Sequence, residues 1–376
     1  MTFRRRGRAP VPGREWVLHT MERWLPLSEQ FVHALVTGSR HPGVVVARRP
    51  LENTDVFPYQ PVRSLRRVPT RWPTARNEQR LVTAGLMTLT ARYHPALVHH
   101  HHGYGAGSSL GFVRRRGVPF VVSLHGEDVT SDARRHPGHL ARVLEVADAV
   151  VVPSRFLMGL AVEIGAREES VYVIPSGVDT QVFAPTPLPG GSPEVVFVGR
   201  FVEKKGVDTL LAAWPSVRSR VPSATLRLVG FGPLETLVPS VGPGVVVEEA
   251  QPTRRGVQVR EAIRGARLVV TPSRTASDGD SESLLLVNLE AQASGRPLVT
   301  TRHGGIPEFV DDGRTALLVP EADPAALAQA MVRVLTDEDL ALRLASAGPA
   351  WVAQFEVSRC TSRVDALYDR LIGAAA

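Results

Sequence analysis

Short β-branched runs alternate with stretches of helical periodicity through most of the chain. In the first half, strands are expected over residues 43–47, 96–100, 119–123, 149–152 and 171–174, and helices over 77–93 and 138–146. This alternation predicts parallel βα units.

A segment rich in proline and glycine, residues 183–193, interrupts the alternation, which then resumes. Further strands are expected over 195–198, 224–229, 245–247, 268–271 and 297–300, with helices beginning at 207 and spanning 283–294 and 324–335. Two similar halves predict two doubly wound, Rossmann-like α/β domains, residues 1–185 and 186–355, that face each other across a cleft. We expect the tail helix, residues 356–376, to pack back on the first domain.

Composition places the chain among globular proteins. Its 376 residues are 43% hydrophobic and 22% charged, enough for two or three domains. The single cysteine, Cys360, excludes a disulfide framework and a multi-cysteine zinc site. No apolar run reaches the roughly 18 residues of a membrane-spanning helix, and the basic segment 1–13 has no apolar stretch behind it, as a signal peptide would. We therefore expect a cytoplasmic protein.

Charge narrows the range of partners. A net charge of +7 favours anionic partners such as nucleotides, nucleic acids or the inner membrane surface. An aromatic content of 6% argues against a surface that stacks nucleic-acid bases, so no nucleic-acid partner is expected. The arginine-rich segment 63–80 is either a solvated face or a peripheral contact with anionic lipid.

The only two lysines among the 44 basic residues, Lys204 and Lys205, lie in one predicted loop. Arg200 precedes them at the end of a strand, and a helix follows. A guanidinium fork and a compact ammonium group at such a point suit a diphosphate, but a charged βα loop without a ligand has the same pattern. Gly230 and Gly232 follow the next strand, where they either let the backbone approach a ligand or form a tight turn.

Two glutamates, Glu282 and Glu290, flank an apolar run that predicts a helix beginning near Ser283. Glu290 would lie about two turns into this helix, near the same face as Glu282. Carboxylates accept hydrogen bonds from polyols, while free N–H groups of the first helical turn bind phosphate. Because an unpaired carboxylate in an apolar stretch is costly, Glu290 indicates a ligand. The segment 302–308 (RHGGIPE) also has glycines that suit a backbone wrapped round a ligand.

In the first half, His125 stands in a polar segment (LHGED) at the end of a strand, where ligands bind in this architecture. The histidine run 99–102 continues an apolar strand, and its alternate members point to opposite faces, so the run alone does not predict a metal site. Residues 103–108 (GYGAGS) nearly match a dinucleotide fingerprint, but Ser108 replaces the third glycine. An NAD-dependent oxidoreductase is therefore an alternative function.

Four segments, in order, resemble the retaining glycosyltransferases of family 4, which have the two-domain GT-B fold. They are VGRFVEKKGVDTLL, LVGFGPL, ESLLLVNLEAQASGRPLV and HGGIPEFVDDGRTALLVPEADP. In the first half, TMERWLPLSEQFV, LVHHHHGYG and VPFVVSLHGED are similar to the branch of exopolysaccharide and colanic-acid-type transferases. The resemblance is strongest over residues 195–348.

The resemblance implies a sugar transferred from a UDP-, GDP- or other nucleotide sugar, with retention at the anomeric carbon. The acceptor would be a glycan, a lipid-linked molecule or a natural product, and no metal or other cofactor would be required. It implies that Arg200 and Lys205 hold the diphosphate and that Glu290 binds the nucleotide ribose.

The resemblance also implies roles around the transferred sugar. Glu282 would hold its hydroxyls, and His125 would approach it and aid the transfer. Backbone amides in the segment Ser283, Leu284, Leu285 and Leu286 would support the phosphate and the sugar. Many relatives have glycine and phenylalanine where Ser283 and Leu284 stand, and residues 26–30 replace their double-glycine loop.

The chemistry of the leaving group agrees with these assignments. Negative charge that develops on a departing nucleoside diphosphate requires fixed cations and N–H dipoles. No second carboxylate is clearly placed as a nucleophile, which favours departure and attack on the same face of the sugar. A non-catalytic GT-B-like protein of a glycan assembly complex is the second alternative.

Overall fold

The computed structural model describes residues 15–26, 29–65, 75–191, 193–240, 244–250 and 255–375, without the side chains of 75, 76, 78, 237–240 and 255. The chain divides into two compact units. Unit 1 is Met1–Ser176 with Ser358–Ala376, and unit 2 is Gly177–Val357. The division follows Ser176, ahead of the expected boundary at residue 185, so the segment 183–193 belongs to unit 2.

Unit 1 is built on a parallel sheet, seven-stranded within the described residues, in the order β3-β2-β1-β4-β5-β6-β7. Its strands are β1 (Val17–Met21), β2 (Gly43–Ala47), β3 (Val62–Ser64), β4 (Leu97–His101), β5 (Phe120–Ser123), β6 (Ala149–Val152) and β7 (Val171–Val173). Its helices are α1 (Gln30–Gly38), α2 (Ala75–Leu89), α3 (Gly103–Ala106), α4 (Leu110–Arg116), α5 (Ser131–Arg135), α6 (His139–Val146), α7 (Arg155–Ile164) and α13 (Val357–Ala375).

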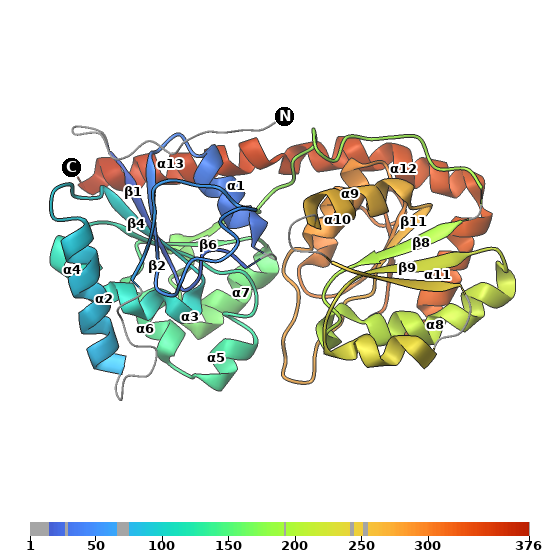
Figure 1. Ribbon diagram of the computed structural model, residues 1–376, viewed down its shortest axis with the longest axis horizontal. Helices are drawn as coiled ribbons and strands as arrows, with labels where there is room; N and C mark the ends of the chain where they lie inside the picture. The colour runs from blue at the N-terminus through green and yellow to red at the C-terminus, as the bar shows by residue number, and fades with distance from the viewer. Residues whose placement is uncertain are drawn as a thin grey trace. The chain divides into compact units, whose positions relative to one another are not determined.

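Alternation along the strands gives unit 1 two apolar cores. Leu18 and Val98 pack on one face of the sheet, with α2, α4, α6 and α7. Val17 and Leu97 pack on the other face, against Leu367 of α13, and α1 covers β1 and β2 there (Figure 1). The tail helix therefore completes the core of unit 1.

Unit 2 repeats this plan with a sheet of six strands among the described residues, in the order β10-β9-β8-β11-β12-β13. The strands are β8 (Glu194–Val198), β9 (Thr225–Gly230), β10 (Val245–Glu249), β11 (Leu268–Thr271), β12 (Leu298–Thr301) and β13 (Leu317–Val319). Helices α8 (Val207–Arg220) and α11 (Pro324–Thr336) pack on one face, and α9 (Arg255–Gly265) and α10 (Leu286–Ala293) on the other (Figure 1). Helix α12 (Glu338–Val352) packs against α10 and also contacts α11.

Two parallel sheets with helices on both faces confirm the predicted α/β class. The predicted strands agree with the structure to within one or two residues at each end, whereas β1, β3 and β13 were not predicted. The helix predicted over 283–294 begins only at Leu286.

Some parts of the sequence that were singled out above lie outside the described residues. They are the basic segment 1–13, residues 66–74 of the arginine-rich segment 63–80, and Leu27 and Ser28. Within the described part of the chain, no helix has both the length and the apolar character needed to cross a membrane.

Candidate functional site

The loop between β8 and α8 carries the cations predicted to bind a diphosphate. Residues Glu203–Lys205 form a single helical turn, and Gly206 follows it with a φ of +66°. A Cβ atom at Gly206 would lie 1.8 Å from the carbonyl oxygen of Pro272, so only glycine fits here. This close packing fixes the direction in which Lys204 and Lys205 leave the loop.

Both lysines pair with carboxylates of the segment that follows β11. Lys205 Nζ lies 2.7 Å from Glu282 Oε1, and Lys204 Nζ lies 2.7 Å from Asp280 Oδ2. These four side chains are between 9% and 17% exposed. Arg200 is half-buried and forms no hydrogen bond or ion pair with a described residue. Three cations therefore gather around two carboxylates, which leaves positive charge for an anionic ligand.

Glu282 is ionised at neutral pH because of these neighbours. Burial by itself raises its pKa, but the charges of Lys205, Lys204 and Arg200 outweigh burial and lower the pKa to about 2. Burial lowers the pKa of Lys205, and the attraction of Glu282 opposes that change. Each partner of the pair thus keeps the other charged in a site with little water.

His303 holds the backbone of Glu282 in place. Its Nε2 accepts a hydrogen bond from the Glu282 N–H at 3.1 Å, and its Nδ1 lies 2.8 Å from Glu321 Oε2. Since Nε2 is the acceptor, the ring proton resides on Nδ1 and is donated to Glu321. The N–H of Gly305 donates to the Glu282 carbonyl at 3.1 Å. The glycines of 302–308 drew attention to this turn, but the role of His303 was missed.

These bonds correct the expected geometry of the glutamate motif. Glu282 and Ser283 lie in a non-helical segment tied to the turn after β12, and α10 begins at Leu286. The two glutamates therefore do not share a helix face, because only Glu290 is helical. Glu290 is 5% exposed within α10.

The N-terminus of α10 is open to an anion. Leu285 is the residue at the cap position, and no side chain in the described part of the chain caps the helix with a hydrogen bond. The first N–H groups of any helix lack partners inside that helix, and the helix dipole makes this end positive. Leu284, Leu285 and Leu286 thus lie where a phosphate is favoured. Glu282, the partner of Lys205, shortly precedes them in the sequence.

Packing explains Gly230 and Gly232 without a ligand. A Cβ atom at Gly230 would lie 1.9 Å from the carbonyl oxygen of Gly199. Gly232 has a φ of +148°, and a Cβ there would lie 2.6 Å from the carbonyl oxygen of Phe201. Both glycines let the loop after β9 pack on the loop that carries Arg200. Their contact with a donor remains a prediction.

In unit 1, His125 lies after the carboxyl end of β5. Its N–H donates to Asp128 Oδ2 at 2.8 Å, and its ring centre is 4.6 Å from those of Phe31 and His102. Its Nε2 is buried without a hydrogen-bond partner among the described residues. Burial, followed by the charge of His102, holds the pKa of His125 well below its ordinary value. The imidazole is therefore neutral at neutral pH.

His102 is a second functional candidate, which the sequence analysis considered only as a member of the histidine run 99–102. Burial lowers its pKa, but Glu29 and Asp128 outweigh that effect and raise the pKa to about 9. Its Nε2 lies 3.1 Å from Glu29 Oε2. The backbone φ of +74° is uncommon for a residue other than glycine and is frequent at functional sites. A cationic imidazole thus stands beside the neutral ring of His125.

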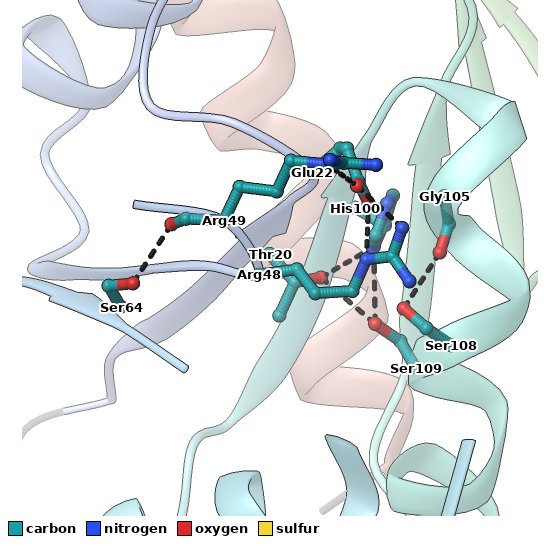
Figure 2. A network of polar contacts seen from close by, with 9 residues as sticks. All are labelled: Thr20, Glu22, Arg48, Arg49, Ser64, His100, Gly105, Ser108 and Ser109. Atoms are coloured by element: carbon teal, nitrogen blue, oxygen red, sulfur yellow. Dashed lines mark hydrogen bonds and ion pairs between the residues drawn. The ribbon is translucent and has the colours of Figure 1, made fainter. Parts of the chain in front are cut away.

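A polar network occupies the carboxyl ends of β1, β2 and β4 in unit 1. Figure 2 shows the guanidinium groups of Arg48 and Arg49 directed at the carboxylate of Glu22. Burial raises the pKa of Glu22, but the hydrogen bonds from both arginines outweigh burial and lower it. Nearby, His100 Nδ1 lies 2.8 Å from Thr20 Oγ1 (Figure 2). Two guanidinium groups on one carboxylate leave a formal charge of about +1 within this network.

Comparisons with known proteins place both units in one family. Residues 192–337 match the model for glycosyl transferases group 1, and residues 29–182 match the model for glycosyltransferase family 4. The GDP-mannose-dependent alpha-(1-6)-phosphatidylinositol monomannoside mannosyltransferase of Mycolicibacterium smegmatis is 35% identical over 269 residues, which span 66% of this chain and 70% of that protein. The chain belongs to glycosyltransferase family 4.

Other relatives agree with this assignment. A putative colanic acid biosynthesis glycosyltransferase, WcaL of Escherichia coli K12, is 30% identical over 62% of this family 4 chain and 61% of its own length. The D-inositol 3-phosphate glycosyltransferase of Nocardiopsis dassonvillei is 31% identical over 73% of this chain and 70% of its own length. These relatives confirm the predicted glycosyltransferase activity and the resemblance to colanic-acid-type enzymes.

Solved structures confirm the GT-B fold of this glycosyltransferase. HepE of Anabaena, solved with UDP and glucose, has a TM-score of 0.76 at 18% identity, covering 94% of this chain and 99% of that one. Sucrose-phosphate synthase of Thermosynechococcus elongatus has a TM-score of 0.74 at 21% identity, covering 96% and 100%. At such identities the likeness concerns the fold alone.

The oxidoreductase alternative does not fit the structure of this glycosyltransferase. Residues 103–108 do not form a glycine-rich turn, because α3 begins at Gly103 and a further helical turn follows. The Gly103 N–H donates to Asp128 Oδ1 at 2.9 Å, so a carboxylate occupies the position that a pyrophosphate would need. A Cβ atom at Gly103 would lie 2.7 Å from Leu124 and Leu140, and packing therefore explains this glycine.

The lowered pKa of Glu282 predicts a pH dependence of stability. Its folded pKa of about 2 lies below the ordinary 4.5, so the ionised carboxylate stabilises the folded protein above that value. This contribution, on the order of 3 kcal/mol, is lost as the pH falls from about 5 towards 2. Urea unfolding of Glu282→Gln at a series of pH values should show a free energy that falls less steeply through this window than that of the wild type.

Glu261→Gln is the matched control, because Glu261 is exposed on α9 of the same unit. Its free energy of unfolding should follow the wild-type curve. Parallel curves for Glu282→Gln and the wild type would show that Glu282 has no lowered pKa.

Proposed function

We propose that this glycosyltransferase binds the diphosphate of a nucleotide sugar in unit 2 and transfers the sugar with retention of configuration. The arrangement of Arg200, Lys204 and Lys205 around the ionised Glu282, directly before the uncapped N-terminus of α10, supports the proposal most strongly. Fixed cations and backbone N–H groups stabilise charge as it develops on a departing diphosphate. Arg200 and Lys205 contact the phosphates, with N–H groups of residues 284–286 beside them.

The two glutamates have different tasks in this proposal. Glu290, buried within α10, accepts hydrogen bonds from the ribose hydroxyls of the nucleotide. Glu282 lies before the helix and accepts hydrogen bonds from hydroxyls of the donor sugar. Because Lys205 pairs with Glu282 and Lys204 with Asp280, both carboxylates are engaged by cations. This pairing favours transfer on one face of the sugar over a covalent intermediate on either carboxylate.

His125 of unit 1 contributes to the transfer step. Its neutral imidazole has a buried Nε2 without a partner among the described residues, and such a nitrogen can accept or donate one hydrogen bond to a sugar hydroxyl. His102 holds a positive charge next to it, so His125 resists protonation. This assignment rests on the resemblance to family 4 and on the state of the ring.

The acceptor is a glycan, a lipid-linked molecule or a natural product with free hydroxyls. Relatives named for phosphatidylinositol monomannoside, colanic acid and inositol 3-phosphate support this class. The first of them is named as GDP-mannose-dependent, which supports a nucleotide-sugar donor. The excess of two guanidinium groups, of Arg48 and Arg49, over the single carboxylate of Glu22 would attract an acceptor that carries a phosphate or another anionic group. A peripheral contact with anionic lipid would bring a lipid-linked acceptor to the enzyme.

Arg200→Ala tests the diphosphate site with little disturbance of the fold, because Arg200 has no hydrogen bond or ion pair with a described residue. Affinity for UDP or GDP should fall by about 1–3 kcal/mol, the range for hydrogen bonds to charged groups. Isothermal titration calorimetry measures the change. Arg314→Ala, which removes an exposed arginine paired with Asp311 in the same unit, should bind like the wild type. Equal affinity in all three proteins contradicts the diphosphate site.

Glu290→Gln and Glu282→Gln should separate nucleotide binding from turnover. Glu290→Gln should weaken the binding of the free nucleoside diphosphate and of the full donor alike. Glu282→Gln should leave the free nucleotide nearly unaffected and lower kcat, since an interaction that strengthens in the transition state affects kcat. Calorimetry and initial rates provide both measurements. An equal loss of nucleotide affinity in both variants refutes the division, and a wild-type protein without transfer or donor hydrolysis would favour the non-catalytic alternative.

Transfer should proceed without an added metal ion. The nearest pair of aspartates, Asp278 and Asp280, forms a loop in which the Asp280 N–H donates to Asp278 Oδ1 at 3.0 Å, while Lys204 holds the Asp280 carboxylate. An ammonium group thus takes the place that a divalent cation would need. Initial rates in EDTA should equal those with magnesium or manganese. Loss of transfer in EDTA that either metal restores would refute metal-independent transfer.

A further inference from the structure

Three buried histidines of unit 1 meet on the face of the sheet covered by α1 and α13. His19 belongs to β1 and lies directly opposite His99 of β4 in the parallel register. His101 lies two residues further along β4 and therefore points to the same face. The three residues are at most 1% exposed, and one ring nitrogen from each lies within 4.8 Å of the others. His19 comes from β1, a strand that the sequence analysis did not predict.

The ring nitrogens of the three histidines form hydrogen bonds within the cluster and with neighbouring side chains, but not all of these nitrogens have a partner among the described residues. His19 Nδ1 lies 3.1 Å from His101 Nε2. His99 is held on both sides, with Nδ1 at 2.5 Å from the Tyr368 hydroxyl and Nε2 at 2.7 Å from Ser123 Oγ. The remaining nitrogen of His19, Nε2, is buried without a hydrogen-bond partner among the described residues.

The electrostatic environment keeps all three rings neutral. Burial is the main cause that lowers the pKa of His19 to about 3, and it holds the pKa of His99 and His101 well below the ordinary value. A protonated ring in this cluster would face two other imidazoles, and no carboxylate of a described residue contributes to the pKa of any of the three rings. Neutral imidazole is the form that coordinates a metal ion, so these rings do not need to lose a proton to bind one.

We propose that His19, His99 and His101 form a structural binding site for one divalent transition-metal ion, with Zn²⁺ as its preferred occupant. Imidazole nitrogens suit Zn²⁺, which binds them at about 2.0–2.1 Å in tetrahedral sites. Ligating nitrogens of such a site lie on the order of 3.3 Å apart, so the three rings need to approach one another slightly. The Ser123 hydroxyl, which bonds His99 Nε2 in the free protein, would give up that bond and supply the fourth, oxygen, ligand.

The surroundings provide support and access for the ion. The Tyr368 hydroxyl accepts the Nδ1 proton of His99 and leaves Nε2 as its ligand nitrogen, an arrangement typical of histidines that bind metal. A cavity of about 40 Å³, lined in part by His101, Ser123 and Cys360, adjoins the site and gives the ion a path. A bound ion would join β1 to β4 and, through Tyr368, to α13.

This site is distinct from the proposed donor site, because all of its ligands belong to unit 1. It predicts a metal ion that stabilises the fold and takes no part in sugar transfer. The inference therefore does not depend on the proposed function.

Zinc binding to the full chain, purified without a polyhistidine tag, tests the proposal. After the protein is stripped with chelator, competition with a chromogenic zinc indicator should show one Zn²⁺ per chain and an increased Tm. His19→Gln and His99→Gln should abolish the stoichiometric binding and the shift in Tm. His100→Gln is the matched control, since His100 belongs to the same strand but points to the opposite face and bonds Thr20. It should bind Zn²⁺ as the wild type does.

Two further measurements keep the proposal testable if a glutamine variant does not fold. Co²⁺ added to the wild type should produce the intense visible absorption of a tetrahedral site. Tyr368→Phe, which removes only the hydroxyl that bonds His99, should weaken Zn²⁺ about 10–100-fold. Binding that is substoichiometric in the wild type, or equal binding in His19→Gln and the wild type, would overturn the proposal and leave a hydrogen-bonded imidazole cluster.

Discussion

The buried pair of Lys205 and Glu282 is the constraint on which the arrangement of unit 2 depends. An ionised group taken out of water costs several kcal/mol, and only a well-placed partner offsets that cost. The loop after β8 and the segment after β11 must therefore meet at a fixed distance. Gly206 permits the first to turn against Pro272, and His303 and Gly305 anchor the backbone of the second. The ion pair therefore requires the segments that follow β8, β11 and β12 to meet in one fixed arrangement.

The pair is built into a set of charges that does not balance. Lys204, Lys205 and Arg200 repel one another, and Glu282 with Asp280 offsets only part of that repulsion. A bound diphosphate would supply the missing negative charge. The N–H groups at the N-terminus of α10 would favour the same anion. The fold therefore bears an electrostatic cost in the free protein that a suitable anion removes. Cations positioned in advance in this way stabilise a leaving group without reorganising at the moment of reaction.

The sequence predicts most of the fold because buried parallel strands are continuous β-branched runs. It fails at β1 (VLHTM), where His19 and Thr20 interrupt the apolar pattern, and at α10, where Ser283 and Leu284 have ordinary helical propensity. Tertiary hydrogen bonds from the turn after β12 hold Glu282, directly before that segment, outside the helix. Motif spacing singled out Lys205 and Glu282, which the structure brings together in the proposed donor site. The pairing of Lys204 and the roles of His102 and His303 depend on contacts between distant segments, which spacing does not record.

The four consecutive histidines at the end of β4, residues 99–102, lie in different environments and differ in charge. Alternation directs His99 and His101 towards α13, where burial and the neighbouring histidines lower their pKa and the rings stay neutral. His100 turns to the opposite face and bonds Thr20, while His102 leaves the strand with a positive φ and pairs with Glu29. Burial alone would make all four rings neutral. The acidic partners of His102 reverse that effect, so position along a single strand decides which imidazole carries charge and which can offer a lone pair.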